Sequence, residues 1–149
     1  MKVISIKNND IYLKEYIELC NKEWGKPRTD LNKYIEDKLT SIKQGNEVIE
    51  VLGLINNNEM IGFISLFSED NNERNDLSPW YATMYIKEKY RGKNYSKILN
   101  DSLIKRAKEL GYKKIYLKSN LINYYEKFNA KYMETLNNGE KLFYIDLGE

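Results

Sequence analysis

Residues 81–99 have the sequence Tyr81-Ala82-Thr83-Met84-Tyr85-Ile86-Lys87-Glu88-Lys89-Tyr90-Arg91-Gly92-Lys93-Asn94-Tyr95-Ser96-Lys97-Ile98-Leu99. This stretch decides the fold, because its pattern changes from strand to helix within a few residues. The first six residues are strand-like, and residues 87–94 form a basic turn. From about Tyr95 to Leu110, apolar residues recur on one face at helical spacing, and Gly111 is a natural helix stop. A strand, a turn and a helix are predicted here.

The turn has the properties of an anion-binding site. Free backbone N–H groups at a helix N-terminus, the helix dipole and the cations Arg91 and Lys93 all favour a phosphate. Gly92 and Asn94 can adopt the positive φ that such loops require. The turn is not a P-loop, because the second glycine and the Lys-Ser/Thr pair are missing. The alternative is an ordinary basic turn with a solvated face.

The residues before this stretch predict a strand, two helices and a hairpin. Val3–Ile6 is a short strand. A helix after Asn8-Asn9-Asp10 carries an apolar stripe, and a second helix after Thr29-Asp30 carries another. The stripe residues are Ile11, Tyr16, Ile17, Cys20 and Trp24 in the first helix and Leu31, Tyr34, Ile35, Leu39 and Ile42 in the second. Two strand-like runs, 48–55 and 60–67, flank a polar turn and predict an antiparallel hairpin.

After the central helix we expect a strand at 114–118, a short helix at 124–128 and two last strands around the turn 137–140. The Asn138-Gly139 pair in that turn is a strong hairpin signal. This order predicts an α/β fold with a single mixed, mostly antiparallel sheet of about six to seven strands, flanked by about four helices. The length of 149 residues suits one domain covering 1–149.

Composition excludes several classes of site. The chain has no histidine and one cysteine, so it lacks the ligands of a zinc site and any Ser-His or Cys-His pair. We expect Cys20 to be a buried packing thiol without function. No apolar run is long enough to span a membrane and no signal peptide is recognisable, so we expect a cytoplasmic protein that binds no membrane.

Charge is distributed unevenly between the two halves. Residues 1–80 carry 10 basic and 14 acidic side chains, whereas residues 81–149 carry 14 basic and 8 acidic ones. The second half is therefore expected to meet an anion, either a phosphorylated cofactor or nucleic acid.

Two motifs and the order of elements resemble the GNAT superfamily of N-acetyltransferases. Residues 91–96 occupy the position of the family's pyrophosphate loop, Q/R-x-x-G-x-G/A, with Asn94 where the family prefers glycine and Ser96 where it prefers glycine or alanine. The segment Asn123-Tyr124-Tyr125-Glu126-Lys127-Phe128 is similar to a terminal helix motif of the family. The run 76–80 also resembles small bacterial members, some of them similar to aminoglycoside and peptide N-terminal acetyltransferases.

The resemblance implies acetyl-CoA as co-substrate and no metal. It implies that Tyr125 protonates the departing CoA thiolate, a role that suits a phenol that is protonated at neutral pH. Packing of the terminal helix is the alternative role for Tyr124 and Tyr125. The cofactor is expected where the fourth and fifth strands splay apart. The expected cofactor-binding residues are Met84, Tyr85 and Ile86 for the pantetheine arm, Arg91, Gly92, Lys93, Asn94, Tyr95 and Ser96 for the pyrophosphate, and Asn120.

An acceptor amine must lose a proton before it attacks, and without histidine the candidate bases are carboxylates. Glu69 and Asp70, with Glu73 and Asp76, lie in the acidic loop before the fourth strand, where family members often form one wall of the acceptor site. The alternative is a solvated loop whose charges balance nearby lysines. Trp80 either forms the floor of an acceptor pocket or is a core aromatic residue.

The predicted function is direct transfer of an acetyl group from acetyl-CoA to a primary amine, either a small cationic amine or a peptide N-terminus. The first alternative is a GNAT-like module that binds acyl-CoA without turnover. The second is a small nucleic-acid-binding protein, although the basic half shows no recognisable nucleic-acid-binding pattern. The last strands could pair with a second copy to give a homodimer. No motif identifies the acceptor.

Overall fold

The computed structural model describes residues 1–69, 73–121 and 124–148. Its elements follow the predicted order along the chain. The strands and helices are β1 (Lys2–Ser5), α1 (Asp10–Trp24), α2 (Leu31–Lys43), β2 (Val48–Asn56), β3 (Glu59–Phe67), β4 (Trp80–Ile86), α3 (Tyr95–Glu109), β5 (Lys114–Ser119), β6 (Ala130–Thr135) and β7 (Lys141–Asp146), with 3-10 turns at Glu88–Tyr90 and Tyr125–Phe128.

The seven strands form one mixed sheet in the order β1-β2-β3-β4-β5-β7-β6. Only β4 and β5 pair in parallel, and α3 is the crossover that connects them. The other neighbouring pairs are antiparallel. The predicted fold class, a single mixed and mostly antiparallel sheet, is confirmed.

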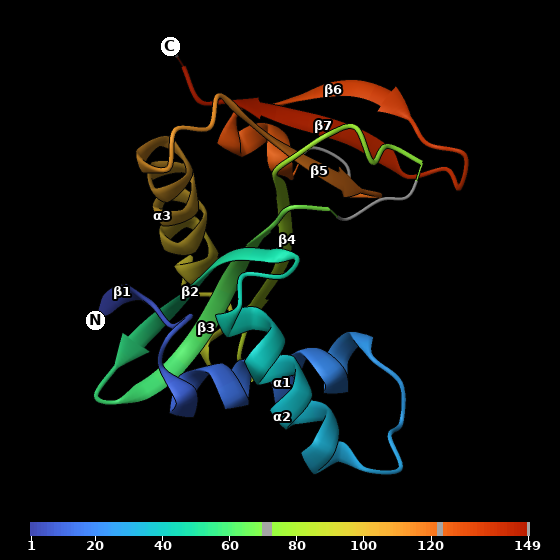
Figure 1. The fold of residues 1–149 in the computed structure, drawn as a ribbon. Coiled ribbons are helices and arrows are strands. Elements are labelled where there is room, and N and C mark those ends of the chain that lie inside the picture. The colour runs from blue at the N-terminus through green and yellow to red at the C-terminus, as the bar shows by residue number, and fades with distance from the viewer. Residues whose placement is uncertain (70–72, 122–123, 149) are drawn as a thin grey trace.

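Helices cover both faces of the sheet (Figure 1). On one face, Leu99, Leu103 and Ala107 of α3 are fully buried in a core that also includes the inner residues of β5 and β7. On the other face, α1 and α2 bury Leu13, Ile17 and Leu39 against β2 and β3. Each helix is amphipathic, so burial of its apolar stripe orients it on the sheet.

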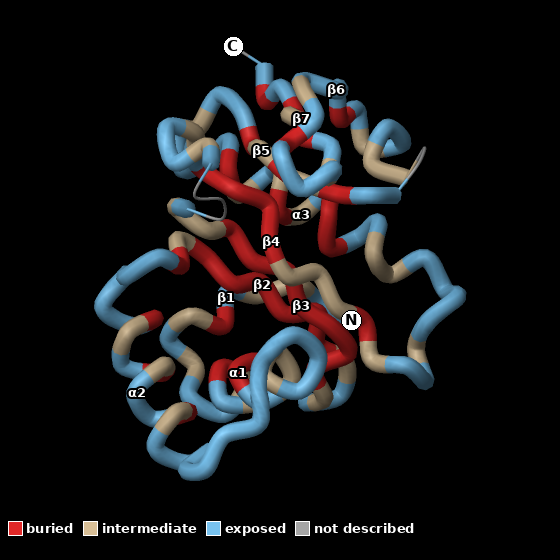
Figure 2. Tube along the Cα trace, turned by 90° about the vertical axis from the view of Figure 1, so that its right-hand side faces the viewer, coloured by how far each residue is buried: buried red, intermediate tan, exposed pale blue. Residues whose placement is uncertain are grey.

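The fourth and fifth strands separate after a single paired position, Trp80 with Tyr116. From there β4 continues with β3 alone, as far as the pair between Gly62 and Ile86. This divergence is the splayed strand pair that the family resemblance implies. Buried residues follow the sheet through β2, β3 and β4, so β4 passes through the middle of the protein (Figure 2).

Some residues predicted to face the core lie elsewhere. Ile11 is 81% exposed and Trp24 is 55% exposed, because they lie on the rim of the α1 stripe rather than at its centre. Leu31 and Ile98 are also partly exposed. The predicted short helix at 124–128 is a 3-10 turn at Tyr125–Phe128, so the fourth helix of the prediction is not an α-helix.

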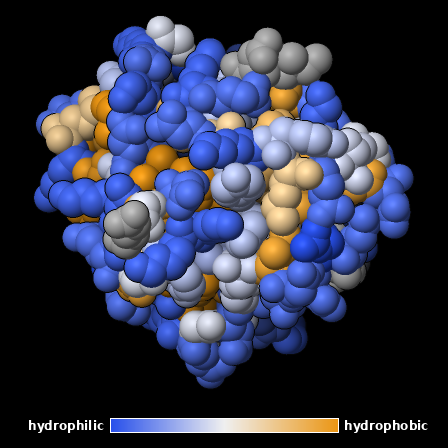
Figure 3. Space-filling model, turned by 90° about the horizontal axis from the view of Figure 1, so that it is seen from above, coloured by the Kyte–Doolittle hydropathy of each residue, from blue (hydrophilic) through white to orange (hydrophobic). Residues whose placement is uncertain are grey.

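Among the described residues, no helix is long and apolar enough to cross a membrane. Hydrophilic residues dominate the face seen from above in Figure 3, and hydrophobic residues appear there in separate patches. The described residues also contain no cluster of three or more His, Cys, Asp or Glu side chains that could hold a metal ion.

Candidate functional site

A cleft of about 370 Å³ opens between the end of β4, the following loop and the start of α3. Its volume lies within the range of small-molecule sites. The C-terminal end of α1 and the segment before the last 3-10 turn complete its walls. The lining residues are Glu23, Trp24, Met84, Tyr85, Ile86, Tyr90, Arg91, Gly92, Asn94, Tyr95, Ser96 and Tyr124.

The loop before α3 has the left-handed backbone that its sequence predicts. Gly92 has a φ of 81° and Asn94 a φ of 64°. Asn9 caps α1 and Asp30 caps α2 by accepting backbone N–H groups, but Asn94 makes no such side-chain bond at the start of α3. Within the part of the chain that the structure describes, the first N–H groups of α3 therefore have no side-chain cap where the helix meets the cleft, which suits an anionic ligand.

Arg91 is exposed, and it lines the cleft. Its Nε donates to the carbonyl oxygen of Ile86 at 2.8 Å, and its guanidinium carbon lies 5.4 Å from the centre of the Tyr85 ring. These contacts hold a cation beside the α3 N-terminus. Lys93 is exposed and, unlike Arg91, does not line the cleft.

A bulge bends β4 at the point where it reaches the cleft. The β3–β4 register shifts between Phe63 and Ser65, and Thr83 has a φ of 43°, which is unusual for a β-branched residue. Thr83 also contacts the Ser65 hydroxyl, which bonds the buried Tyr16 hydroxyl at 2.9 Å. The sequence gives no signal for this bulge, yet it sets the direction of Met84, Tyr85 and Ile86.

Tyr125 is half-buried beside the cleft, next to Tyr124, which lines it. Its ring makes edge contacts with Tyr81 and Tyr124, at centroid distances of 5.5 Å and 4.7 Å. Burial, with a smaller contribution from Tyr124, raises the pKa of Tyr125. The phenol therefore stays protonated at neutral pH. Asn120 is exposed and does not line the cleft, so it is not brought to the other predicted cofactor residues.

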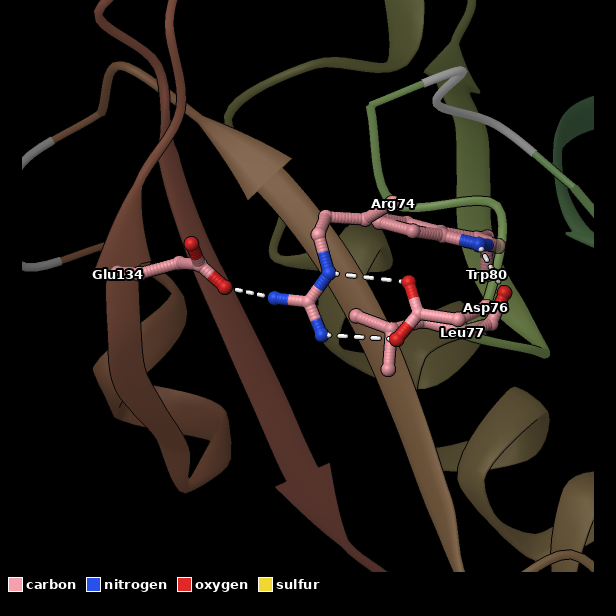
Figure 4. Close-up of polar contacts among 5 residues, drawn as sticks. All are labelled: Arg74, Asp76, Leu77, Trp80 and Glu134. Carbon is pink, nitrogen blue, oxygen red and sulfur yellow. Dashed lines mark hydrogen bonds and ion pairs between the residues drawn. The ribbon is translucent and has the colours of Figure 1, made fainter.

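The acidic loop packs against the last hairpin (Figure 4). Asp76 accepts from Arg74 Nε and Nη2, both at 3.0 Å, and Arg74 also pairs with Glu134 of β6. Glu73 accepts from the backbone N–H of Asn137 at 3.0 Å. Arg74 thus joins the loop to β6, and Glu73 joins it to the turn that follows β6.

Of the two carboxylates predicted first as bases, the structure describes Glu69 alone. Glu69 is exposed and does not line the cleft, and Asp70 lies outside the described residues. Glu23, at the end of α1, is the carboxylate among the described lining residues. Trp80 is fully buried and donates to the Leu77 carbonyl at 2.8 Å, so it is a core residue rather than the floor of a pocket.

Four lining residues were not predicted from the sequence: Glu23, Trp24, Tyr90 and Tyr124. The Trp24 ring lies 6.2 Å from the Tyr85 ring in an edge arrangement, which places the end of α1 beside β4. The place of Trp24 in the cleft could have been suggested by its position at a helix end, because a large apolar residue on the last turn can leave the core stripe.

A family model described as "Acetyltransferase (GNAT) family" matches residues 10–130. This range includes β4, the loop, α3 and Tyr125. No curated protein sequence matches the chain significantly.

Solved structures are similar over nearly the whole chain. An N-acetyltransferase from Staphylococcus aureus Mu50 has a TM-score of 0.73 and 20% identity, with 99% of this chain and 100% of that chain covered. An aminoglycoside 6'-N-acetyltransferase complexed with coenzyme A has a TM-score of 0.73 and 16% identity, with coverage of 100% and 98%. A spermidine N-acetyltransferase SpeG chimera from Vibrio cholerae and hSSAT has a TM-score of 0.70 and 16% identity, with coverage of 99% and 97%. At these identities the likeness shows the fold.

Proposed function

The chain belongs to the GNAT family of acetyltransferases, and from this premise we propose that it transfers an acetyl group from acetyl-CoA directly to a primary amine. The observation that carries the proposal is the cleft itself. It combines an α3 N-terminus without a side-chain cap, a left-handed loop and the Arg91 cation at the point where β4 leaves β5.

The residues present fit a pyrophosphate and a pantetheine arm. Arg91 and the N–H groups of Tyr95 and Ser96 supply positive charge at one end of the cleft. Met84 and Tyr85 supply backbone groups along the splayed part of β4, while the Ile86 carbonyl already accepts from Arg91. A thioester bound here supplies the activated acetyl group, and the strand backbone would polarise its carbonyl. Lys93 and Asn120 stay in the proposal as contacts to the outer parts of the ligand.

Tyr125 is proposed as the general acid. Its phenol lies beside a lining residue of the cleft and keeps its proton at neutral pH, since burial raises its pKa. The acceptor nitrogen attacks the acetyl carbon, the C–S bond breaks, and Tyr125 gives its proton to sulfur. Transfer is direct, because Cys20 packs between α1 and the sheet and does not line the cleft.

The proposed acceptor is a small cationic amine or a peptide N-terminus. Two structural neighbours are named for amines, an aminoglycoside in one case and spermidine in the other. In this chain, the Glu23 carboxylate and the exposed Trp24 indole line the cleft together, and both attract a cation. Glu69 and Asp70 remain proposed as the groups that take the amine proton, and Glu23 joins them on the basis of its place in the cleft.

The experiment measures CoA release from acetyl-CoA in the presence of a panel of small amines and short peptides. We expect Tyr125→Phe to lower kcat by a factor of about 10² or more, the usual contribution of a general acid, with little change in the KM for acetyl-CoA. Phe128→Tyr, which adds a hydroxyl group to another ring of the same 3-10 turn, serves as the control. Equal kcat in wild type and Tyr125→Phe would remove Tyr125 as the acid.

The same assay separates the two alternatives. A module that binds acyl-CoA without turnover would bind acetyl-CoA and release no CoA with any amine. A nucleic-acid-binding protein would bind nucleic acid with steep salt dependence and would not bind acetyl-CoA.

A further inference from the structure

Two polar atoms are buried without a hydrogen-bond partner among the described residues, and one of them belongs to a ring that contacts the proposed acid. They are the Tyr81 hydroxyl and Oδ1 of Asn100. Tyr81 is 6% exposed and Asn100 1% exposed. Buried polar groups are nearly always paired, so these two unpaired atoms require an explanation.

Their positions connect the first turn of α3 with Tyr125. Tyr81 directly follows the paired position of β4 and β5, and its ring meets the Tyr125 ring edge-on, at 5.5 Å and 78°. Asn100 lies one turn after Ser96 on α3, and its Nδ2 donates to the Ser96 carbonyl at 2.8 Å. An amide nitrogen carries two hydrogens, so Asn100 has a second one for another acceptor.

The electrostatic effects among these groups have a consistent direction. The pKa of Tyr81 is raised well above its usual value, chiefly by burial and further by Tyr125 and Tyr124, whereas Asn100 lowers it. Tyr81 in turn acts to lower the pKa of Tyr125, against the larger effect of burial. The directions of these pKa shifts fit an Asn100 amide N–H that points toward the Tyr81 oxygen and a Tyr81 hydroxyl that points toward the Tyr125 oxygen.

We infer that, once Tyr125 has given up its proton, Asn100 and Tyr81 form a chain of hydrogen-bond donors that ends on the phenolate oxygen of Tyr125. The inference rests on the proposed role of Tyr125 as general acid. When the C–S bond breaks and Tyr125 gives its proton to sulfur, a phenolate remains in a half-buried site. The Tyr81 hydroxyl donates to that phenolate, and Asn100 donates to Tyr81, until water or the proton released by the amine restores the phenol. Tyr81 and Asn100 are thus positioning residues, since neither lines the cleft.

A purely structural role predicts different behaviour. The Tyr81 hydroxyl makes no hydrogen bond with the described residues, so its removal in Tyr81→Phe leaves no partner unpaired. The melting temperature of this variant is therefore expected to equal or exceed that of the wild type. Its effect should appear in kcat alone.

The test measures kcat, KM for acetyl-CoA and melting temperature in six proteins: wild type, Tyr81→Phe, Tyr125→Phe, the double variant of these two, Asn100→Leu and Tyr112→Phe. Tyr112 packs against the same core beyond the other end of α3 and is the matched control. Tyr81→Phe is expected to lower kcat by about tenfold or more, the size of one hydrogen bond to a charged group, with unchanged KM. In the Tyr125→Phe background it is expected to have no further effect. Leucine is similar in volume to asparagine. Asn100→Leu, with Tyr125 intact, is therefore also expected to lower kcat.

The outcomes test the donor chain separately from the role of Tyr125 as acid. If Tyr125→Phe is slow but Tyr81→Phe keeps the wild-type kcat, the donor chain is wrong and the acid assignment stands. Equal losses from Tyr81→Phe in both backgrounds would also overturn the chain, because Tyr81 would then act independently of Tyr125. If Tyr125→Phe keeps full kcat, the acid assignment fails first and the inference fails with it.

Discussion

The thiol of Cys20 packs among apolar residues between α1 and the sheet. Burial raises its pKa from an ordinary value of 9.0 to about 12, although the Tyr16 hydroxyl and Lys38 act in the opposite direction. The predicted packing role agrees with this position on the α1 stripe, although Cys20 is partly rather than fully buried. Such a thiol is a poor nucleophile at neutral pH, in agreement with direct transfer.

This raised pKa makes stability depend on pH in the alkaline range. Below pH 9 the thiol is protonated in both folded and unfolded chains, so it contributes no pH dependence. Between pH 9 and about 12 the unfolded chain loses the proton and the folded chain keeps it, so the free energy of unfolding falls as pH rises. Urea unfolding at pH 8 and pH 10.5 is expected to show a smaller fall for Cys20→Ala than for the wild type. One proton limits the difference to about 1.4 kcal/mol per pH unit. Equal falls in both proteins would show that the folded thiol ionises normally.

At this scale, the sequence does not predict the role of residues that depend on neighbours far along the chain. Arg91 and Ser96 belong to one continuous motif, so their place in the cleft could be predicted. Glu23 and Trp24 reach the cleft only because α1 ends beside Tyr85, and no local pattern encodes that contact. Asp76 carries an acidic charge like any candidate base, yet it pairs with Arg74, which also pairs with Glu134 of the last hairpin.

At the scale of elements, the path of β4 shapes the cleft. The strand bulges at Thr83, stays close to β3 at Gly62 and leads through Gly92 into α3. Helix and strand periodicity predicts the elements and most of their ends, because both periods are local. Periodicity could not predict the bulge, since it arises from the contact of Thr83 with Ser65 and Tyr16 on other elements.

Two glycines on this path are expected to respond differently to alanine. At Gly62 a Cβ would collide with the Tyr85 carbonyl oxygen and lie 2.7 Å from Ile86 Cδ1, so Gly62→Ala must displace β4. We expect a loss of about 2 kcal/mol in unfolding free energy and weaker acetyl-CoA binding. At Gly92 a Cβ meets no atom within 4 Å, and the cost is only the strain of a φ of 81°, about 1 kcal/mol.

Chemical unfolding and acetyl-CoA titration of both variants test this difference. Gly92→Asn is the matched control, since asparagine tolerates the left-handed region and should retain more stability than Gly92→Ala. A Gly62→Ala protein with wild-type stability and acetyl-CoA affinity would contradict the close approach of β3 and β4.

At the scale of the whole molecule, two parts of one sheet meet at β4 and β5. They share a single paired position, and the buried Trp80 packs there with Leu136 and Leu142. The Arg74 contacts to Asp76 and Glu134 reinforce the same junction (Figure 4). The overall α/β architecture follows from the order of elements, whereas this junction depends on residues far apart along the chain, such as Trp80 and Leu142, and could not be read from local pattern.

The junction explains why the cleft forms at this point of the sheet. Because β5 leaves β4 after one pair, the edge of β4 that faces away from β3 is open between Met84 and Ile86. The start of α3 lies at the same end of the strand. The asymmetry of charge agrees with this arrangement, since the net positive half of the chain supplies the loop and α3.

The most direct test of the central claim is the melting temperature with and without acetyl-CoA, for wild type, Arg91→Glu and Lys108→Glu. The last variant makes the same change in charge at the far end of α3, away from the cleft. A ligand at a hundred times its Kd adds about 2.7 kcal/mol to the stability of the folded state. We predict a clear rise in melting temperature for wild type and Lys108→Glu, and its loss in Arg91→Glu. No rise in the wild type, or an equal rise in Arg91→Glu, would contradict a cofactor site at the start of α3.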